Sequence, residues 1–83
     1  MEPKIRLDMR TMLDPQRLRK WLYQELLYWN DADYFPPERA SRWHRMAKRC
    51  ARMLGTSRDA FVAELGAQVR AHMRERADPR GEA

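Results

Sequence analysis

The stretch from Leu18 to Trp29 reads Leu-Arg-Lys-Trp-Leu-Tyr-Gln-Glu-Leu-Leu-Tyr-Trp, and eight of its twelve residues are apolar or aromatic. At about 100° of rotation per residue, most of its leucine and tryptophan side chains fall on one broad face of an α-helix. The other apolar and tyrosine side chains widen that face beyond half of the circumference. Because a helix that apolar must be covered from more than one side, we interpret residues 18–29 as the centre of a small all-α fold.

The composition is typical of one folded domain. Hydrophobic residues make up 43% of the 83-residue chain, which argues against intrinsic disorder although 35% of the residues are charged. No apolar run approaches the roughly 18 residues of a membrane span, so we expect no membrane contact. The single cysteine, Cys50, suits a reducing compartment, and we expect a cytoplasmic protein with one helical domain over residues 1–83.

Cap and turn residues divide the chain into three expected helices, at about 15–30, 37–54 and 57–76. Asp14 followed by Pro15 is typical of a helix start, because Asp accepts from free backbone N–H groups and Pro is tolerated at the first helical position. Gly55 is typical of a left-handed C-terminal cap, and Thr56 with Asp59 resembles a capping box. The short connections favour antiparallel neighbours and therefore a small three-helix bundle.

The N-terminal segment has a different periodicity. Residues 4–10 alternate polar and apolar side chains, with Ile5, Leu7 and Met9 on one side, which is a strand-like pattern. A single strand needs a partner edge, so two interpretations stay open. We favour an extended N-terminal arm over 1–13 that lies along the helices; the alternative is a strand paired with another copy. At the other end we expect a short disordered C-terminal tail over 79–83.

The second expected helix, residues 37–54, carries the excess positive charge. Its net charge of +5 equals that of the whole chain, so the remaining residues balance. Five of its six cations gather over about 120° on the side that projects away from the apolar residues: Arg42, Arg45, Lys48, Arg49 and Arg52. Exposed helices usually intersperse both signs, so this face is typical of a surface for phosphate groups or an acidic protein. A solvated face in an Arg-rich chain is the alternative.

The loop after the first expected helix is acidic and aromatic. Asp31, Asp33, Tyr34 and Phe35 form a second candidate partner-binding set. In one interpretation Tyr34 and Phe35 cap the core, with Phe35 folded over the first turn of the next helix as a hydrophobic staple. In the other they are exposed aromatic anchors for a partner protein.

Glu25 is a carboxylate on the same face as Trp21 and Trp29, so it must be paired, hydrogen-bonded or at the rim of the core. We expect a structural ion pair with Arg39 or a hydrogen bond from the indole of Trp43; the alternative is a group that binds a partner.

Catalytic and metal-binding patterns do not emerge from the sequence. No second acid or base accompanies Glu25, and His44 and His72 match no metal-ligand spacing. We expect Cys50 to be a buried apolar side chain and His72 to lie at the edge of the core. The sequence therefore predicts no enzyme activity, no catalytic residue, no metal and no cofactor.

These features favour a small non-enzymatic binding module, acting as a stoichiometric inhibitor or adaptor through protein–protein contact. We expect an acidic or nucleic-acid-handling protein partner, and a monomer or homodimer. Small phage or mobile-element inhibitors of host nucleic-acid machinery, including anti-CRISPR proteins, offer an analogy of size and simplicity rather than of motif.

The alternative is a DNA-binding transcriptional regulator that uses the basic helix face or a dimeric N-terminal strand. A strand over 4–10 followed by two helices has the order of a ribbon-helix-helix dimer. Lys4, Arg6, and Asp8 or Arg10 would then enter the major groove. The third helix and the two prolines of the loop depart from that order.

Overall fold

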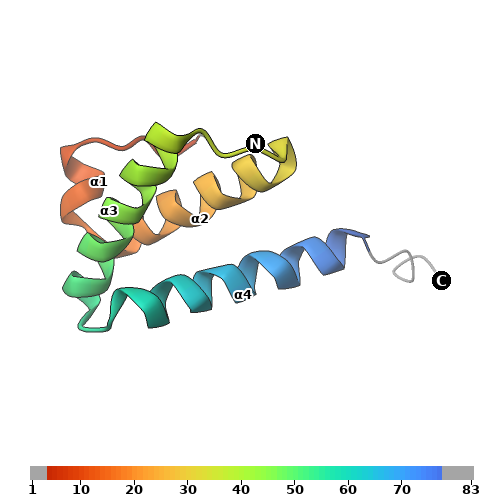
Figure 1. Cartoon of the computed structure of the whole chain (residues 1–83). Coiled ribbons are helices and arrows are strands. Elements are labelled where there is room, and N and C mark those ends of the chain that lie inside the picture. The colour runs from red at the N-terminus through yellow and green to blue at the C-terminus, as the bar shows by residue number, and fades with distance from the viewer. Residues whose placement is uncertain (1–3, 78–83) are drawn as a thin grey trace.

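All regular secondary structure in residues 4–77, the part that the computed structural model describes, is α-helical. The helices are α1 (Met9–Leu13), α2 (Pro15–Ala32), α3 (Pro37–Leu54) and α4 (Arg58–Ala77) (Figure 1). The all-α fold class expected from the sequence is therefore confirmed, and α2, α3 and α4 occupy the three expected helical segments. The expected tail at 79–83 and the first three residues of the arm lie outside the described residues.

Helices α2 and α3 are antiparallel neighbours, as their side-chain contacts show. The Cys50 thiol, late in α3, lies 3.4 Å from the carbonyl oxygen of Pro15 at the start of α2. Further along, the indole N–H of Trp43 donates to the Leu22 carbonyl at 2.9 Å. Because the loop at residues 33–36 is short, the chain reverses directly from one helix into the other.

Helix α4 runs in the same direction as α2 (Figure 1). Near the start of α2, the Arg19 guanidinium donates to the Gln68 side chain at 3.0 Å, and near its end Arg76 lies 3.5 Å from the Asp31 carboxylate. The ammonium group of Lys4 lies 4.6 Å from the Tyr28 ring centroid. Both ends of the described chain therefore contact the last turns of α2.

The core lies where α2, α3 and α4 meet. Apart from Trp43, the buried side chains of α3 are small, whereas those of α2 and α4 are large, so the C-terminal half of α3 approaches its neighbours closely. The buried hydrophobic residues are Leu18, Trp21, Leu22, Trp43, Ala47, Cys50, Ala51, Phe61, Leu65 and Val69. The prediction that residues 18–29 form the central helix holds for its first half, since Leu26, Leu27 and Trp29 are only half-buried.

Two of the expected helix boundaries are confirmed in atomic detail. The Asp14 carboxylate accepts from the backbone N–H groups of Gln16 and Arg17 at 3.0 and 3.4 Å, with Pro15 at the first helical position. Gly55 ends α3 with φ of 76°, in the left-handed region where glycine carries no steric penalty.

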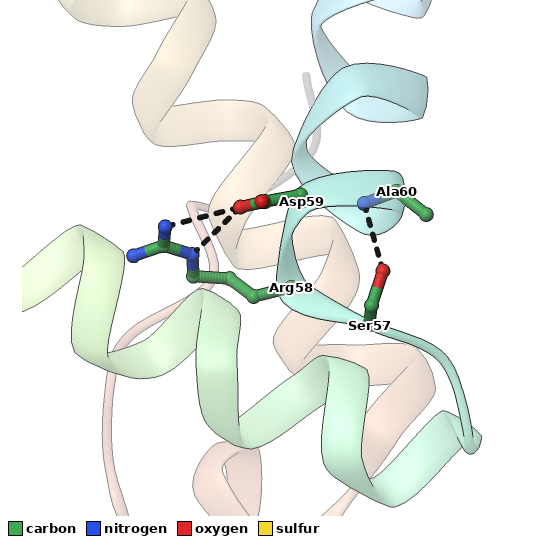
Figure 2. A network of polar contacts seen from close by, with 4 residues as sticks. All are labelled: Ser57, Arg58, Asp59 and Ala60. Carbon is green, nitrogen blue, oxygen red and sulfur yellow. Dashed lines mark hydrogen bonds and ion pairs between the residues drawn. The ribbon is translucent and has the colours of Figure 1, made fainter.

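The expected capping box at the start of α4 is wrong by one residue. Ser57 is the cap: its hydroxyl accepts from the Ala60 N–H at 3.1 Å (Figure 2). Thr56 instead completes the end of α3, because its N–H donates to the Ala51 carbonyl at 2.9 Å. The Asp59 carboxylate accepts from the neighbouring Arg58 guanidinium at 3.0 Å (Figure 2).

The second part of the expected N-terminal arm, residues 9–13, is a helix. Residues 4–8 contain no helix or strand and lie along α2, where the Gln24 side-chain amide exchanges two hydrogen bonds of 3.1 Å with the backbone of Ile5. Residues 9–13 form α1, which begins where the Asp8 carboxylate accepts from the Thr11 N–H at 2.9 Å. A strand over 4–10 is therefore incorrect for this chain, because Met9 and Arg10 are helical.

Candidate partner-binding surface

The structure divides the five cations of the expected basic face of α3 into two groups. Arg45, Lys48 and Arg52 are exposed, and within residues 4–77 they form no ion pair. We call these three residues the α3 basic face. Arg42 and Arg49 are half-buried and contact neighbouring helices. Three of the five cations of the expected face are therefore available to a partner. The sixth cation of α3, Arg39, is also exposed, but it lies near the start of the helix, with its guanidinium 5.8 Å from the Trp29 ring centroid.

The sequence predicts that Arg49 projects freely into solvent, but in the structure its side chain is held by a hydrogen bond. Its Nε–H donates to the Met12 carbonyl oxygen at 2.7 Å, at the end of α1. The Arg42 guanidinium carbon lies 5.9 Å from the ring centroid of Trp21, in cation–π geometry. Both arginines therefore hold α3 to the N-terminal half of the molecule. Sequence reasoning missed this role because it placed no helix at residues 9–13.

Exposed apolar side chains border the α3 basic face. The bond between Arg49 and Met12 places α1 beside the C-terminal half of α3. On α1, Met9 and Leu13 are 69% and 61% exposed, and Met53, one turn after Arg49, is 36% exposed. We call Met9, Leu13 and Met53 the apolar margin. The helix that carries the α3 basic face thus also carries Met53 and lies beside the helix that carries Met9 and Leu13.

The two acidic residues of the second candidate set have structural roles. Asp33 ends α2 in the left-handed region, with φ of 59°, and its N–H donates to the Asn30 carbonyl at 3.2 Å. Asp31 pairs with Arg76 of α4 at 3.5 Å. Because the last turn of α2 contains no basic residue of its own, Arg76 supplies the positive charge that a helix C-terminus favours.

The two aromatic residues of that set behave differently. Phe35 stacks on Trp29 with ring centroids 5.6 Å apart and an interplanar angle of 13°, and it packs against the core. This confirms the core-capping role for Phe35, with its ring stacked on a residue of α2. Tyr34 is 64% exposed, so core capping is wrong for its side chain.

The α3 basic face and the loop at residues 33–36 are not brought together. The loop precedes α3, whereas Arg45, Lys48 and Arg52 lie in its middle and C-terminal part. At 1.5 Å per residue, Arg52 is roughly 20 Å along the helix axis from the loop. A partner would need a broad footprint to contact both, so we treat the α3 basic face with the apolar margin as one site.

The expected partners of Glu25 are wrong. Its carboxylate accepts from the indole N–H of Trp29 at 3.2 Å, one turn further along α2. The indole of Trp43 donates instead to the Leu22 carbonyl, and the Arg39 guanidinium lies 5.8 Å from the Trp29 ring centroid. The reason is helix geometry, since residues four apart are neighbours on one face.

Cys50 and His72 occupy the expected environments. The Cys50 side chain is fully buried, and this desolvation raises the pKa of its thiol above the usual value. His72 is half-buried, with its ring centroid 6.5 Å from that of Tyr23 in an edge-to-face arrangement.

No group of three or more potential metal ligands occurs within residues 4–77. None of the four helices is both long and apolar enough to cross a membrane.

Comparison of the chain with protein-family models, with curated proteins and with experimentally determined structures found no significant match.

Proposed function

We propose that this protein is a small binding module whose α3 basic face contacts an acidic surface of a partner protein. The observation that carries the proposal is the set of three exposed cations, Arg45, Lys48 and Arg52, on a helix whose C-terminal half lies beside α1 with its exposed apolar side chains. Their charges are not neutralised by ion pairs within the described residues, so an acidic partner gains their full attraction.

The apolar margin favours a protein partner over nucleic acid. Protein–protein interfaces combine a desolvated apolar centre, in which methionine is enriched, with a charged rim. Interfaces with nucleic acid are more polar and are dominated by contacts to phosphate. Exposed Met9 and Leu13 beside cationic α3 therefore suit an acidic protein surface that also offers apolar side chains.

We propose binding instead of catalysis because the recorded polar contacts have structural explanations. Ser57, Asp8 and Asp14 cap helices, and Glu25 accepts from an indole on its own helix. The narrower proposal of an inhibitor or adaptor acting on nucleic-acid-handling machinery, as anti-CRISPR proteins do, is supported by chain size and composition alone.

A matched pair of charge-reversal variants tests the proposal. Arg45→Glu/Arg52→Glu alters the α3 basic face, and Arg70→Glu/Arg74→Glu makes the same charge change at exposed positions of α4. In affinity capture from a lysate of the source organism, we expect the wild type and the α4 variant to retain an acidic protein that the α3 variant loses. Circular dichroism checks that all three chains fold.

Direct binding to duplex DNA would contradict the proposal. In that case the logarithm of the affinity would fall by about 0.9 per phosphate contact for each tenfold rise in salt. The α3 variant would lose DNA binding and the α4 variant would keep it. Equal partner capture by both variants would also contradict the proposal, because it would show that the α3 basic face is only solvated.

A further inference from the structure

A pocket lies between the N-terminal arm, α2 and α4, away from the contacts described for α3. Its volume is about 500 Å³ and it is open to solvent on one side. Ile5 of the arm, Tyr23 and Leu27 of α2 form its apolar lining, with Arg19 and Lys20 as its cations. Pockets of about 300–1,000 Å³ are of the size that holds small molecules.

Hydrogen bonds fix the walls of this pocket. The Gln24 side chain donates to the Ile5 carbonyl and accepts from the Ile5 N–H, both at 3.1 Å, so the arm is fastened to α2. On the opposite side, Arg19 donates to Gln68 of α4 at 3.0 Å. These bonds join segments that are far apart in the sequence, so the pocket is largely preformed. A ligand therefore spends little binding free energy on ordering the pocket walls.

The charges at the pocket favour an anion. None of the residues that line it is acidic. The Arg19 charge is partly balanced by Glu64, 3.8 Å away, whereas exposed Lys20 forms no ion pair within residues 4–77. Lys20 is therefore the cation available to a ligand. A carboxylate at Lys20 would place an attached apolar group beside Tyr23 and Leu27.

We infer that this pocket binds a small amphipathic carboxylate, with its anionic group at Lys20 and its apolar group against Ile5, Tyr23 and Leu27. Charge and apolar surface are both required, because exposed ion pairs alone contribute little affinity in water. The inference is independent of the proposed function, which concerns the α3 basic face.

Decanoate below its micellar concentration is the test probe, with decyltrimethylammonium as a cation of the same chain length. Amide resonances of the full-length protein, followed by NMR, report the site and the affinity. We expect saturable decanoate shifts at Ile5, Tyr23 and Leu27, and weaker or absent shifts with the cation. Lys20→Met should weaken decanoate binding by about fivefold, Lys20→Arg should restore it, and Lys48→Met should leave it unchanged.

Results of three kinds would overturn the inference. The first is equal binding of decanoate and decyltrimethylammonium, which would indicate that charge has no part. The second is unchanged decanoate affinity in Lys20→Met, or the largest shifts at α3. The third is binding of a short acidic peptide, acetyl-Asp-Phe-Glu-amide, at the pocket without binding of decanoate, which would indicate a peptide site instead.

Discussion

Arginine side chains on α3 serve two purposes, and the difference lies in single contacts. Arg49 reaches the Met12 carbonyl at 2.7 Å, whereas Arg52, one turn further along, is exposed. A hydrogen bond from a guanidinium to a carbonyl that is shielded from water is stronger than one between neutral groups. The two residues therefore carry the same charge and contribute differently to stability.

We predict that Arg49→Met lowers the free energy of unfolding by about 1–2 kcal/mol, because the Met12 carbonyl loses its charged donor. Arg52→Met is the matched control and should change stability by less than about 0.5 kcal/mol. Urea unfolding followed by circular dichroism measures both. Equal effects would show that the bond between α3 and α1 is not formed in solution.

Asp8 gives α1 a dependence on pH. Hydrogen bonding by Thr11, first through its N–H and then through its side chain, holds the pKa of the Asp8 carboxyl below its usual value, and the charge of nearby Arg17 adds a smaller effect. A lowered folded-state pKa means that the stabilisation is present above the unfolded-state pKa and is lost as pH falls through the folded-state value.

We therefore predict that α1 loosens below about pH 4, near and under the unfolded-state pKa of aspartate. Hydrogen exchange of the Thr11 amide should accelerate relative to amides in the middle of α2. In Asp8→Asn, which keeps a capping oxygen without a titrating group, this change should be absent. Acceleration of the same size in Asp8→Asn would rule out the carboxyl as its cause.

At the level of the helices, the two described glycines have opposite roles. Gly55 ends α3 with φ of 76°, and a Cβ there would have open space, so only the backbone conformation opposes a side chain. Gly66 lies inside α4, where a Cβ would meet only the end of the Arg70 side chain at 3.3 Å. One glycine is needed for the fold and the other weakens a helix.

We predict that Gly55→Ala lowers the free energy of unfolding by about 1 kcal/mol, because alanine is strained in the left-handed region. Gly66→Ala should raise it by about 0.5–1 kcal/mol, because alanine favours the helix and Arg70 can shift. Thermal and urea unfolding provide the measurement. Destabilisation by Gly66→Ala would mean that α4 packs more closely at this point than its exposed neighbours indicate.

The helices with strong local signals were predictable, and the contacts between them were not. Asp14, Pro15 and Gly55 act within a few residues of their own position, so their roles follow from the sequence. The choice between Thr56 and Ser57 as cap depended on how α3 ends, which no pattern specified. The sequence analysis paired Glu25 with a residue of another helix, although the indole N–H of Trp29, four residues away on the same helix, is its donor.

Helix α1 was missed because its short length leaves no periodicity to detect. The period of two at Ile5, Leu7 and Met9 suggested a strand that continued through residue 10. Asp8 before Thr11 is a helix-start signal, but five residues are too few to form a stable helix alone. Contacts with Arg17 and Arg49 hold this helix in place, and such distant contacts cannot be read from the sequence.

For the whole molecule, Cys50 reports on unfolding. Its thiol is fully buried among α2 and α3, and burial raises its pKa. The pKa of the Cys50 thiol is higher in the folded than in the unfolded state, so the contribution of the thiol to the free energy of unfolding is present below the unfolded-state pKa. That contribution is lost as pH rises through the folded-state value.

We predict that at pH 8 a thiol reagent such as 5,5′-dithiobis(2-nitrobenzoate) modifies Cys50 only as fast as the bundle opens. Stabilising the protein with Gly66→Ala should slow the reaction, and moderate urea should accelerate it. Thr56→Cys in a Cys50→Ala background gives the exposed control, which should react immediately. Immediate reaction of Cys50 in the native protein would show that α2 and α3 separate without global unfolding.

The contacts of Lys4 and Arg76 with the last turns of α2 also bear on the connectivity of the chain. Because Lys4 and Arg76, close to the two ends of the described chain, lie against the same end of one helix, we expect that a peptide linker can join these ends. The exposed turn at Gly55 could then supply new termini, so that α4 would lead into the arm, α1, α2 and finally α3. The three-dimensional arrangement is therefore compatible with circular permutation.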